Sequence, residues 1–380
     1  MLARCHNIED LRRQAARRLP TPIFDFLDGG AEDEATLRNN RMAFDREKLV
    51  PSCLRDVETV DTATTIFGQA SALPLICAPT GASRLFHPAG EIAVARAAAR
   101  AGVPYALSTG STRSIEEVAA ASDGAKIFQL YVYKDHGVNR ELIERARAAG
   151  YGALCITVDV AVVGKRERDL RHGLSIPMRF TPAAVARFAC SPRWLWGVRG
   201  GLGLGANLKT IGGAAGRGRG ASTSWQLDPS LDWDGLADLA ALWNGPFVVK
   251  GIMAADDARH ALDAGATGII ISNHGGRQLD GAAAPIEVLP AIAQAVAGRA
   301  DIVLDGGVRR GTHILKAIAL GAKGVAIGRP YLYGLAAGGE AGVDRALAIL
   351  HKELAVAMQL AGCPDLGAID ERLILRASPA

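Results

Sequence analysis

The chain has 380 residues, 49% of them hydrophobic and 22% charged, and its formal net charge is only +4. This length allows one large α/β barrel or two ordinary domains, and the composition excludes global disorder. The small net charge gives no reason to expect a nucleic-acid partner. No run of about 18 or more apolar residues is present, so no transmembrane helix is expected, and the N-terminus lacks the apolar core of a signal peptide.

Six cysteines are scattered along the chain without a C-x-x-C pair. This spacing argues against a zinc site and against a disulfide framework, and it is typical of a reducing compartment. We therefore expect no bound metal. The cysteines are Cys5, Cys53, Cys77, Cys155, Cys190 and Cys363.

In chain order, residues 1 to about 70 come first and are predicted to form a helical cap at one end of the fold. Eight short apolar runs follow, and most are separated by an Ala-rich amphipathic segment such as "GEIAVARAAARAG". This alternation predicts an α/β fold, a (β/α)₈ TIM barrel within a single domain of residues 1–380, with a doubly wound open sheet as the alternative. The expected strands are Leu75–Pro79, Pro104–Ser108, Lys126–Tyr131, Leu154–Asp159, Pro246–Lys250, Gly268–Ser272, Asp301–Asp305 and Gly324–Gly328.

A long insertion, residues 170–227, interrupts the alternation after the fourth expected strand. It contains no Asp or Glu, whereas the rest of the chain has more acidic than basic residues. It could be a disordered surface insertion, or an anchor that places aromatic side chains at lipid headgroups and arginines on anionic lipid. We favour the anchor, because disorder alone does not require the sequence Trp-Leu-Trp. Its basic residues are Arg171, Arg179, Arg187, Arg193, Arg199, Lys209, Arg217 and Arg219, and its large apolar groups include Phe180, Phe188, Trp194, Leu195 and Trp196.

Polar residues and glycines gather at the carboxyl ends of the expected strands, where a barrel carries its active site. Each polar group alone has a structural explanation: Asp159 could cap a helix, Lys250 could be a solvated strand end, and Tyr131 could belong to the core. Their joint occurrence at one end of eight strands predicts a functional site. The residues are Pro79, Thr80, Gly81, Ser108, Gly110, Gln129, Tyr131, Thr157, Asp159, Arg166, Lys250, Ser272, His274, Arg277, Asp305, Gly306, Gly307, Arg309, Gly328 and Arg329.

Two groups within this set suggest a chemistry. Histidine as a residue type can exchange a proton near neutral pH, and arginine can bind a carboxylate through two hydrogen bonds, so His274 and Arg277 suggest a proton acceptor beside an anion clamp. In "DGGVRRG" and "IGRP", two glycines and two arginines follow the seventh and eighth strands, where barrels commonly bind phosphate. Without a P-loop or a G-x-G-x-x-G motif, this predicts a phosphorylated cofactor such as FMN, with Lys250 beside the flavin N1.

The motifs "SNHGGRQLDG", "FQLYVYKD", "TVDV", "VKGI", "DGGVRRG" and "IGRP" resemble those of the FMN-dependent α-hydroxy acid oxidase and dehydrogenase family. The resemblance covers nearly the whole chain and is strongest to the mandelate and lactate dehydrogenases of that family. It implies that His274 is the catalytic base, that Asp159 orients it, and that Tyr131 binds the substrate hydroxyl. Arg277 and Arg166 would bind the substrate carboxylate.

The resemblance also implies which residues bind FMN. They are Pro79, Thr80, Gly81, Ser108, Gln129, Thr157, Lys250, Ser272, Asp305, Gly306, Gly307, Arg309, Gly328 and Arg329.

One position departs from the family. A second active-site tyrosine is usual in a "YDY" run, but this chain has Phe24-Asp25-Phe26. Phe26 has no hydroxyl for the substrate carboxylate, which should weaken the smallest acids most. Gly110 and Gly81 should add space, because glycolate oxidase has a tryptophan at the position of Gly110. The expected substrate pocket therefore consists of Phe26, Gly81, Gly110, Tyr131, Arg166, His274 and Arg277.

The leading interpretation is oxidation of a mandelate-like or lactate-like (S)-2-hydroxy acid to the 2-oxo acid, with electrons passed to a membrane quinone. Its alternatives are an oxidase that uses O₂, an FMN-containing barrel isomerase, and a non-catalytic binding protein. We expect a cytoplasmic protein on the inner face of the cell membrane, held there by residues 170–227. The resemblance implies a homo-oligomer, a tetramer.

Overall fold

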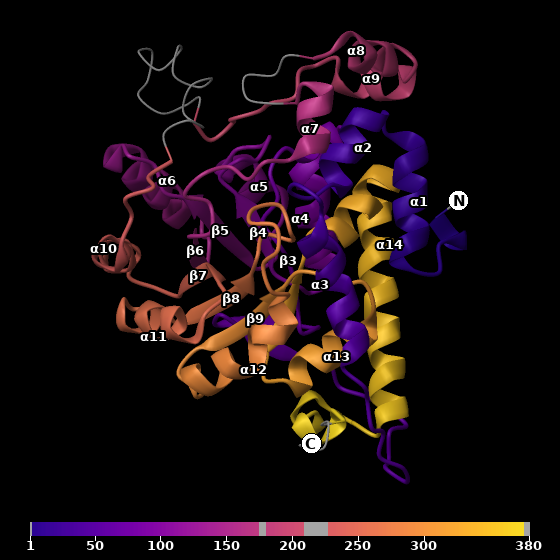
Figure 1. Ribbon diagram of the computed structural model, residues 1–380, viewed down its shortest axis with the longest axis vertical. Coiled ribbons are helices and arrows are strands. Elements are labelled where there is room, and N and C mark those ends of the chain that lie inside the picture. Colours follow the sequence, from indigo (N-terminus) through magenta and orange to yellow (C-terminus); the bar gives the residue numbers. More distant parts are fainter. Residues whose placement is uncertain (1, 175–179, 209–226, 376–380) are drawn as a thin grey trace.

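The computed structural model describes residues 2–174, 180–208 and 227–375. Eight parallel strands close into a barrel in the order β10-β3-β4-β5-β6-β7-β8-β9 (Figure 1). Val325 of the last strand pairs with Leu75 of the first, which confirms the TIM barrel and excludes the open sheet. The strands are β3 (Leu75–Cys77), β4 (Tyr105–Ser108), β5 (Lys126–Tyr131), β6 (Ala153–Thr157), β7 (Phe247–Ile252), β8 (Gly268–Ser272), β9 (Asp301–Asp305) and β10 (Gly324–Ile327).

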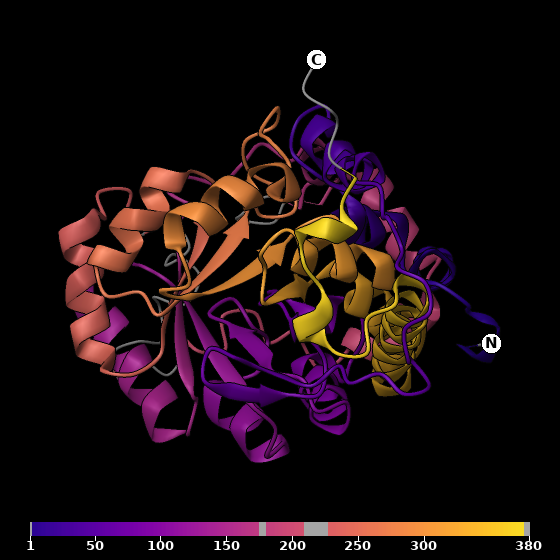
Figure 2. The same ribbon diagram turned by 90° about the horizontal axis from the view of Figure 1, so that it is seen from below.

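Helices surround the strands, as the view from below shows (Figure 2). Their inner faces and the outer faces of the strands form one continuous apolar core. A smaller cluster, with Ile76, Val248 and Ala326 among its members, fills the barrel itself. The barrel helices are α4 (Gly90–Arg100), α5 (Ile115–Ala121), α6 (His136–Ala148), α10 (Trp233–Trp243), α11 (Ala255–Asp263), α12 (Pro285–Val296), α13 (Gly311–Ala319) and α14 (Arg329–Ala361).

Three strand ends differ from the expected bounds in ways that matter for the site. β3 and β6 end two residues early, so Pro79 and Asp159 lie on loops. β7 instead continues to Ile252 through a register shift after Lys250, where Gly251 has a φ of 113°. Only glycine adopts this conformation readily.

The first 70 residues do not form one cap. The helices η1 (Leu2–Arg4), α1 (Ile8–Arg18), α2 (Thr21–Asp28) and α3 (Ala35–Arg46) come first. α2 lies at the carboxyl ends of the strands, whereas the hairpin of β1 (Thr64–Ile66) and β2 (Gln69–Ser71) lies at the opposite end. There, the Phe67 N–H donates to Asp301 at the start of β9. The apolar Ile66 and Phe67 fit this open end of the barrel. The first 70 residues are therefore divided between the two ends of the barrel.

Two helices of the insertion, α8 (Pro182–Ala189) and α9 (Pro192–Val198), are formed and packed, so the disordered alternative is wrong for these residues (Figure 1). The helix α7 (Glu167–His172) leads into the insertion. Phe188 is only 8% exposed, and the Trp194 indole donates to the Leu85 carbonyl, so two expected surface aromatics face inward. Arg179, Lys209, Arg217 and Arg219 lie outside the described residues. The chain ends in η5 (Leu366–Ala368) and η6 (Glu371–Leu373).

Candidate functional site

A cavity of about 260 Å³ lies at the carboxyl ends of the strands, next to α2. We call it the main cavity. Most of the residues predicted from the sequence line it: Phe26, Pro79, Thr80, Gly81, Tyr131, Arg166, Lys250, His274, Arg277, Asp305, Gly306, Gly307, Arg309, Gly328 and Arg329. Ser108, Gln129, Thr157, Asp159 and Ser272 lie outside this lining. Thr157, Asp159 and Ser272 pair with Tyr131, His274 and Lys250, which line it, whereas Ser108 and Gln129 are hydrogen-bonded to each other. Gly110 is also outside the lining, behind Gly81.

His274 Nδ1 and Asp159 Oδ1 lie 3.0 Å apart, at hydrogen-bond distance. Although burial opposes it, His274 and Lys250 hold the pKa of Asp159 below its usual value. A carboxylate bound to Nδ1 keeps the ring hydrogen there, so Nε2 remains free to accept a proton. That atom lies 3.5 Å from the Tyr131 hydroxyl, whose pKa is raised to about 12 by burial. Together these groups can accept a proton and donate a hydrogen bond to one substrate.

The backbone of His274 is strained, with a φ of 58°. This left-handed conformation is uncommon for a residue with a side chain and marks positions that the surrounding structure holds in place. The Ser272 hydroxyl accepts the His274 N–H at 3.0 Å. The local fold therefore fixes the imidazole at the end of β8.

Two arginines lie on the Phe26 ring. The guanidinium carbons of Arg277 and Arg166 are 5.2 and 5.9 Å from the ring centroid. Asp169, one helical turn from Arg166, accepts its Nε–H at 2.7 Å. Burial, followed by Arg166 and Arg329, holds the pKa of Arg277 well below its usual value. A bound carboxylate would relieve this crowding of positive charge, so the cluster suits an anionic ligand.

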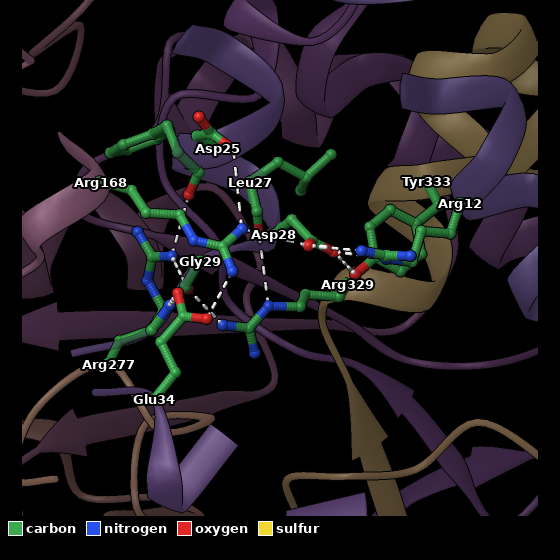
Figure 3. Close-up of polar contacts among 12 residues, drawn as sticks. Arg12, Asp25, Leu27, Asp28, Gly29, Glu34, Arg168, Arg277, Arg329 and Tyr333 are labelled. Carbon is green, nitrogen blue, oxygen red and sulfur yellow. Dashed lines mark hydrogen bonds and ion pairs between the residues drawn. The ribbon is translucent and has the colours of Figure 1, made fainter. Parts of the chain in front are cut away.

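The carboxyl end of α2 orients the arginines (Figure 3). Arg277 donates to the Phe26 and Gly29 carbonyls, at 2.9 Å each, and Arg329 donates to the same Gly29 oxygen at 2.8 Å. The helix end is itself held by Asp28, which accepts two hydrogen bonds from Arg12 and one from Tyr333. Backbone carbonyls leave no side-chain signal, so the sequence did not reveal this arrangement.

Lys250 is a buried cation at the base of the main cavity, only 3% exposed. Its ammonium donates to Ser272 at 2.9 Å and lies 3.3 Å from Asp305. Burial disfavours the charge, but Asp159 and Asp305 outweigh it and raise the pKa of Lys250. The residue therefore stays charged and can stabilise negative charge on a ligand above it.

The residues present fit FMN at the polar side of its ring. The Ser108 hydroxyl donates to Gln129 Oε1 at 2.9 Å, while Gln129 Nε2 and Thr157 Oγ1 are buried without a hydrogen-bond partner. Buried polar atoms are rarely left unpaired in native proteins. Gln129 Nε2, Thr157 Oγ1 and the Lys250 ammonium are suited to hydrogen-bond the carbonyl and nitrogen atoms along one edge of an isoalloxazine ring.

The phosphate end fits as well. Gly306 and Gly307 have φ values of 124° and 80°, and a Cβ on Gly307 would lie 1.8 Å from the Asn40 carbonyl oxygen. A side chain is therefore excluded at Gly307 by the Asn40 backbone. Both glycines line the main cavity, where their backbone can approach an anion. Burial lowers the pKa of Arg309, a cation that would gain from a phosphate partner. Among the described residues, no cluster of His, Cys, Asp and Glu is arranged to hold a metal.

Several cavity residues were not predicted from the sequence. Phe86 lines the main cavity and stacks on Phe26 with centroids 6.2 Å apart. Tyr331 lies outside the lining, and its hydroxyl is 2.7 Å from that of Thr80, which belongs to it. Phe86 follows a short 3₁₀ helix, η2 (Ser83–Leu85), and nothing in its sequence distinguishes it from a core residue. The three-residue spacing of Arg166 and Asp169 could have revealed their ion pair.

The sequence matches the FMN-dependent dehydrogenase family over residues 15–376. It is 46% identical over 374 residues to an L-lactate oxidase of Nostoc sp., with 96% of both chains covered. It is 43% identical over 375 residues to an L-lactate dehydrogenase of Caulobacter vibrioides, with 97% of both covered. A 4-hydroxymandelate oxidase of Amycolatopsis orientalis is 44% identical over 362 residues, covering 95% of this chain and 96% of the other.

Two solved structures superpose closely on this chain. The monotopic membrane protein (S)-mandelate dehydrogenase superposes with a TM-score of 0.92 at 39% identity, covering 98% of this chain and all of the other. A mandelate oxidase superposes with a TM-score of 0.82 at 42% identity, covering 96% and 97%.

Proposed function

Because this chain belongs to the family of FMN-dependent dehydrogenases that oxidise 2-hydroxy acids, we propose that it converts an (S)-2-hydroxy acid with an aromatic or long side chain to the 2-oxo acid. The observation that carries the proposal is the His274–Asp159 pair, which lies beside Tyr131 in the cavity that also contains Arg277 and Arg166. FMN, when bound, supplies the two-electron oxidant.

His274 acts as the general base at Nε2. Asp159 keeps the ring in the correct tautomer and stabilises the imidazolium that forms when the base takes a proton. The Tyr131 hydroxyl, protonated at neutral pH, hydrogen-bonds the substrate oxygen at C2. Arg277 and Arg166 bind the carboxylate, which orients the substrate hydroxyl toward the base.

The remaining polar residues would hold FMN. Ser108, Gln129, Thr157 and Lys250 would bind the polar edge of the ring, with Ser272 and Asp305 supporting the lysine. Pro79, Thr80 and Gly81 would contact the ring. The backbone of Gly306, Gly307 and Gly328 and the guanidinium groups of Arg309 and Arg329 would bind the phosphate.

The preference for larger acids rests on Phe26. Its ring lies under both arginines and against Phe86, so it presents an apolar wall where a hydroxyl would otherwise meet the carboxylate. Gly81 contributes space in the same wall. A side chain there would be crowded, because its Cβ would lie 3.0 Å from the Gly110 carbonyl. Gly110 acts through this contact, since it does not itself line the cavity.

A membrane quinone is the proposed electron acceptor, with O₂ as the alternative. Support comes from the insertion, where Phe180, Leu195 and Trp196 are 43%, 40% and 70% exposed. The similar (S)-mandelate dehydrogenase is described as a monotopic membrane protein. None of the helices in the described ranges is long and apolar enough to cross a membrane. We therefore propose attachment to the inner face of the cell membrane through residues 170–227, with a tetramer as the oligomer.

The test is a substrate screen with an artificial electron acceptor. Protein loaded with FMN should oxidise mandelate-like or long-chain (S)-2-hydroxy acids with a higher kcat/KM than glycolate. Bleaching of the flavin by these acids without air identifies the reductive half of the reaction. If no 2-hydroxy acid bleaches the flavin, the isomerase alternative gains support and the proposal fails. Stopped-flow reoxidation by air compared with a quinone then separates an oxidase from a dehydrogenase.

A further inference from the structure

A second cavity, of about 560 Å³, lies between the end of α1, residues 84–88, α9 and α14. We call it the arginine–tryptophan cavity. It is distinct from the main cavity, and none of the roles assigned above uses it. The close packing of α9 builds one wall, because a Cβ on Gly197 would lie 2.8 Å from the Pro88 ring. The inner part of the insertion is therefore tied to the loop that follows β3.

The two cavities are separated by very little protein. Phe86 lines both of them. On α14, Leu332 lines the main cavity and Ala336 lines the arginine–tryptophan cavity. These residues are four positions apart, about 6 Å along a helix. A ligand in the second cavity would therefore lie close to the flavin site, with the Phe86 ring between them.

The lining of the arginine–tryptophan cavity selects a class of ligand. Its charged side chains are Arg17, Arg18, Arg84 and Arg193, and no Asp or Glu belongs to the described lining. Arg84 Nε is buried without a hydrogen-bond partner. His87 Nδ1 accepts the Ala89 N–H, which leaves Nε2 to carry the ring hydrogen in the neutral form. The cavity thus offers hydrogen-bond donors to oxygen atoms that accept them.

Aromatic rings form the other walls. Phe86 and Trp194 line the cavity, and the Trp194 indole is fixed by its bond to the Leu85 carbonyl. Trp196, 70% exposed, lies at the cavity's solvent side. A planar ring that carries carbonyl oxygens can stack on the aromatic side chains and accept hydrogen bonds from the arginines. A phosphate ion would pair with the arginines, but it would not stack on the aromatic rings and would gain nothing from lying near the flavin.

We propose that the arginine–tryptophan cavity binds the head group of a quinone, which collects the electrons of hydroxy acid oxidation across Phe86. This inference rests on the proposed function and adds a site for the acceptor. The quinone would take two electrons from the reduced flavin across Phe86 and two protons from solvent, and the reduced flavin would release its own proton to solvent. The quinone leaves as a quinol, and the flavin returns to its oxidised form.

Two variants probe the cavity without touching the main one. Arg84→Gln removes the guanidinium whose buried Nε has no hydrogen-bond partner, and Ala336→Met fills space in the lining that Ala336 shares with Phe86. Arg96→Gln, an exposed substitution on α4, is the matched control. All are prepared as FMN-loaded protein, and binding of a ubiquinone with one isoprene unit to the oxidised protein is measured by calorimetry. Flavin bleaching by the hydroxy acid and reduction of a soluble dye are measured in parallel.

Arg84→Gln and Ala336→Met should each weaken quinone binding and raise the KM for quinone by about tenfold, the effect of losing one charge-assisted hydrogen bond or comparable space. The rate of flavin bleaching and the KM for hydroxy acid should stay within about twofold of the wild type, because neither residue touches the substrate. Arg96→Gln should match the wild type in every assay.

Two results would overturn the inference in distinguishable ways. If the wild type reduces quinone but both cavity variants bind and reduce it normally, the acceptor site lies elsewhere and the proposed function stands. If the wild type bleaches with hydroxy acid but neither binds nor reduces quinone, the quinone half of the proposed function fails as well. Inorganic phosphate is the competing probe, because tight phosphate binding lost in Arg84→Gln, without quinone binding, would make the cavity an anion site.

Discussion

Arg277 and Arg329 donate hydrogen bonds to the same acceptor, the Gly29 carbonyl oxygen at the end of α2. Arg277 is proposed to bind the substrate carboxylate and Arg329 the FMN phosphate. One peptide group therefore positions a cation of each site. A change that loosens the end of α2 should therefore weaken cofactor binding and substrate binding together.

Asp28→Asn tests this dependence. Asp28 fixes the helix end through its bonds to Arg12 and Tyr333. Removing its charge should weaken FMN binding and raise the KM for hydroxy acid, each by about tenfold, while kcat at saturation changes less. Fluorescence titration of FMN and steady-state kinetics measure the two effects. Asp25→Asn is the matched control on the same helix, because Asp25 pairs with His172 and Arg168 on α7, of which Asp28 shares only the Arg168 contact, at 3.6 Å. Equal losses in both variants would argue for general damage to α2.

His274→Gln should abolish bleaching of the flavin by hydroxy acid while FMN stays bound, because the histidine belongs to the substrate side of the site. A general base contributes about 10²–10⁴-fold. Asp159→Asn should lower the rate in the same direction, since the ring loses the partner that holds its tautomer. Anaerobic stopped-flow measurements give the rates, with the exposed His351→Gln as control. Turnover within threefold of wild type in His274→Gln would place the base elsewhere.

The sequence predicted the barrel and most of the site for one physical reason. Parallel strands bring their carboxyl ends to one edge, so residues such as Tyr131, Lys250 and His274, each at or just beyond a strand end, had to meet. The contacts of Gly29 could not be predicted, because a carbonyl oxygen has no residue identity. The inward orientation of Phe188 and Trp194 could not be predicted either, because it depends on how α8 and α9 pack on distant segments of the chain.

Phe26→Tyr should improve the smallest substrates most. The new hydroxyl would lie at the ring edge between the two arginines and give the carboxylate one more donor. The gain should be about two- to tenfold in kcat/KM for glycolate, which corresponds to about 0.5–1.5 kcal/mol for a neutral hydrogen bond. Mandelate-like acids should gain less, because their side chains already contribute to binding. Parallel kinetics with both acids measure the ratio, and a uniform gain would contradict the role of Phe26 in side-chain preference.

The stability of the phosphate end should depend on pH through His313. Its ring stacks on Phe44 with centroids 4.3 Å apart, and its Nδ1 accepts the Arg309 N–H. Burial, with Lys316 and Arg309, lowers the pKa of His313 to about 4. The unfolded chain, with a pKa of about 6.5, binds the proton first, so the free energy of unfolding falls as pH drops from about 6.5 to about 4.

The loss through His313 should reach about 3 kcal/mol at most. Urea denaturation across this pH range measures it, and His313→Gln should reduce the slope. An unchanged slope in the variant would assign the pH dependence to other groups. FMN release should accelerate over the same range in the wild type, because Arg309 loses the acceptor of its backbone N–H when the ring is protonated.

The exposed apolar side chains of the insertion give the last prediction. Val185 on α8 and Leu195 and Trp196 on α9 are 52%, 40% and 70% exposed, and the Arg199 guanidinium lies 3.6 Å from the Trp196 ring centroid. Aromatic and aliphatic groups beside arginines are suited to the interface of an anionic bilayer. Wild-type protein should therefore sediment with anionic liposomes at low salt, and less with neutral ones.

The double variant Leu195→Gln/Trp196→Gln should bind these liposomes more weakly, while FMN content and dye reduction by hydroxy acid stay unchanged. Neither residue belongs to the lining of the main cavity, so their loss leaves the flavin and substrate contacts intact. The matched control is Leu279→Gln, an equally apolar exposed position, 75% exposed, on a loop outside the insertion. Equal binding by wild type, the double variant and the control would show that these side chains do not attach the enzyme to a membrane, and the quinone would then have to reach the protein from solution.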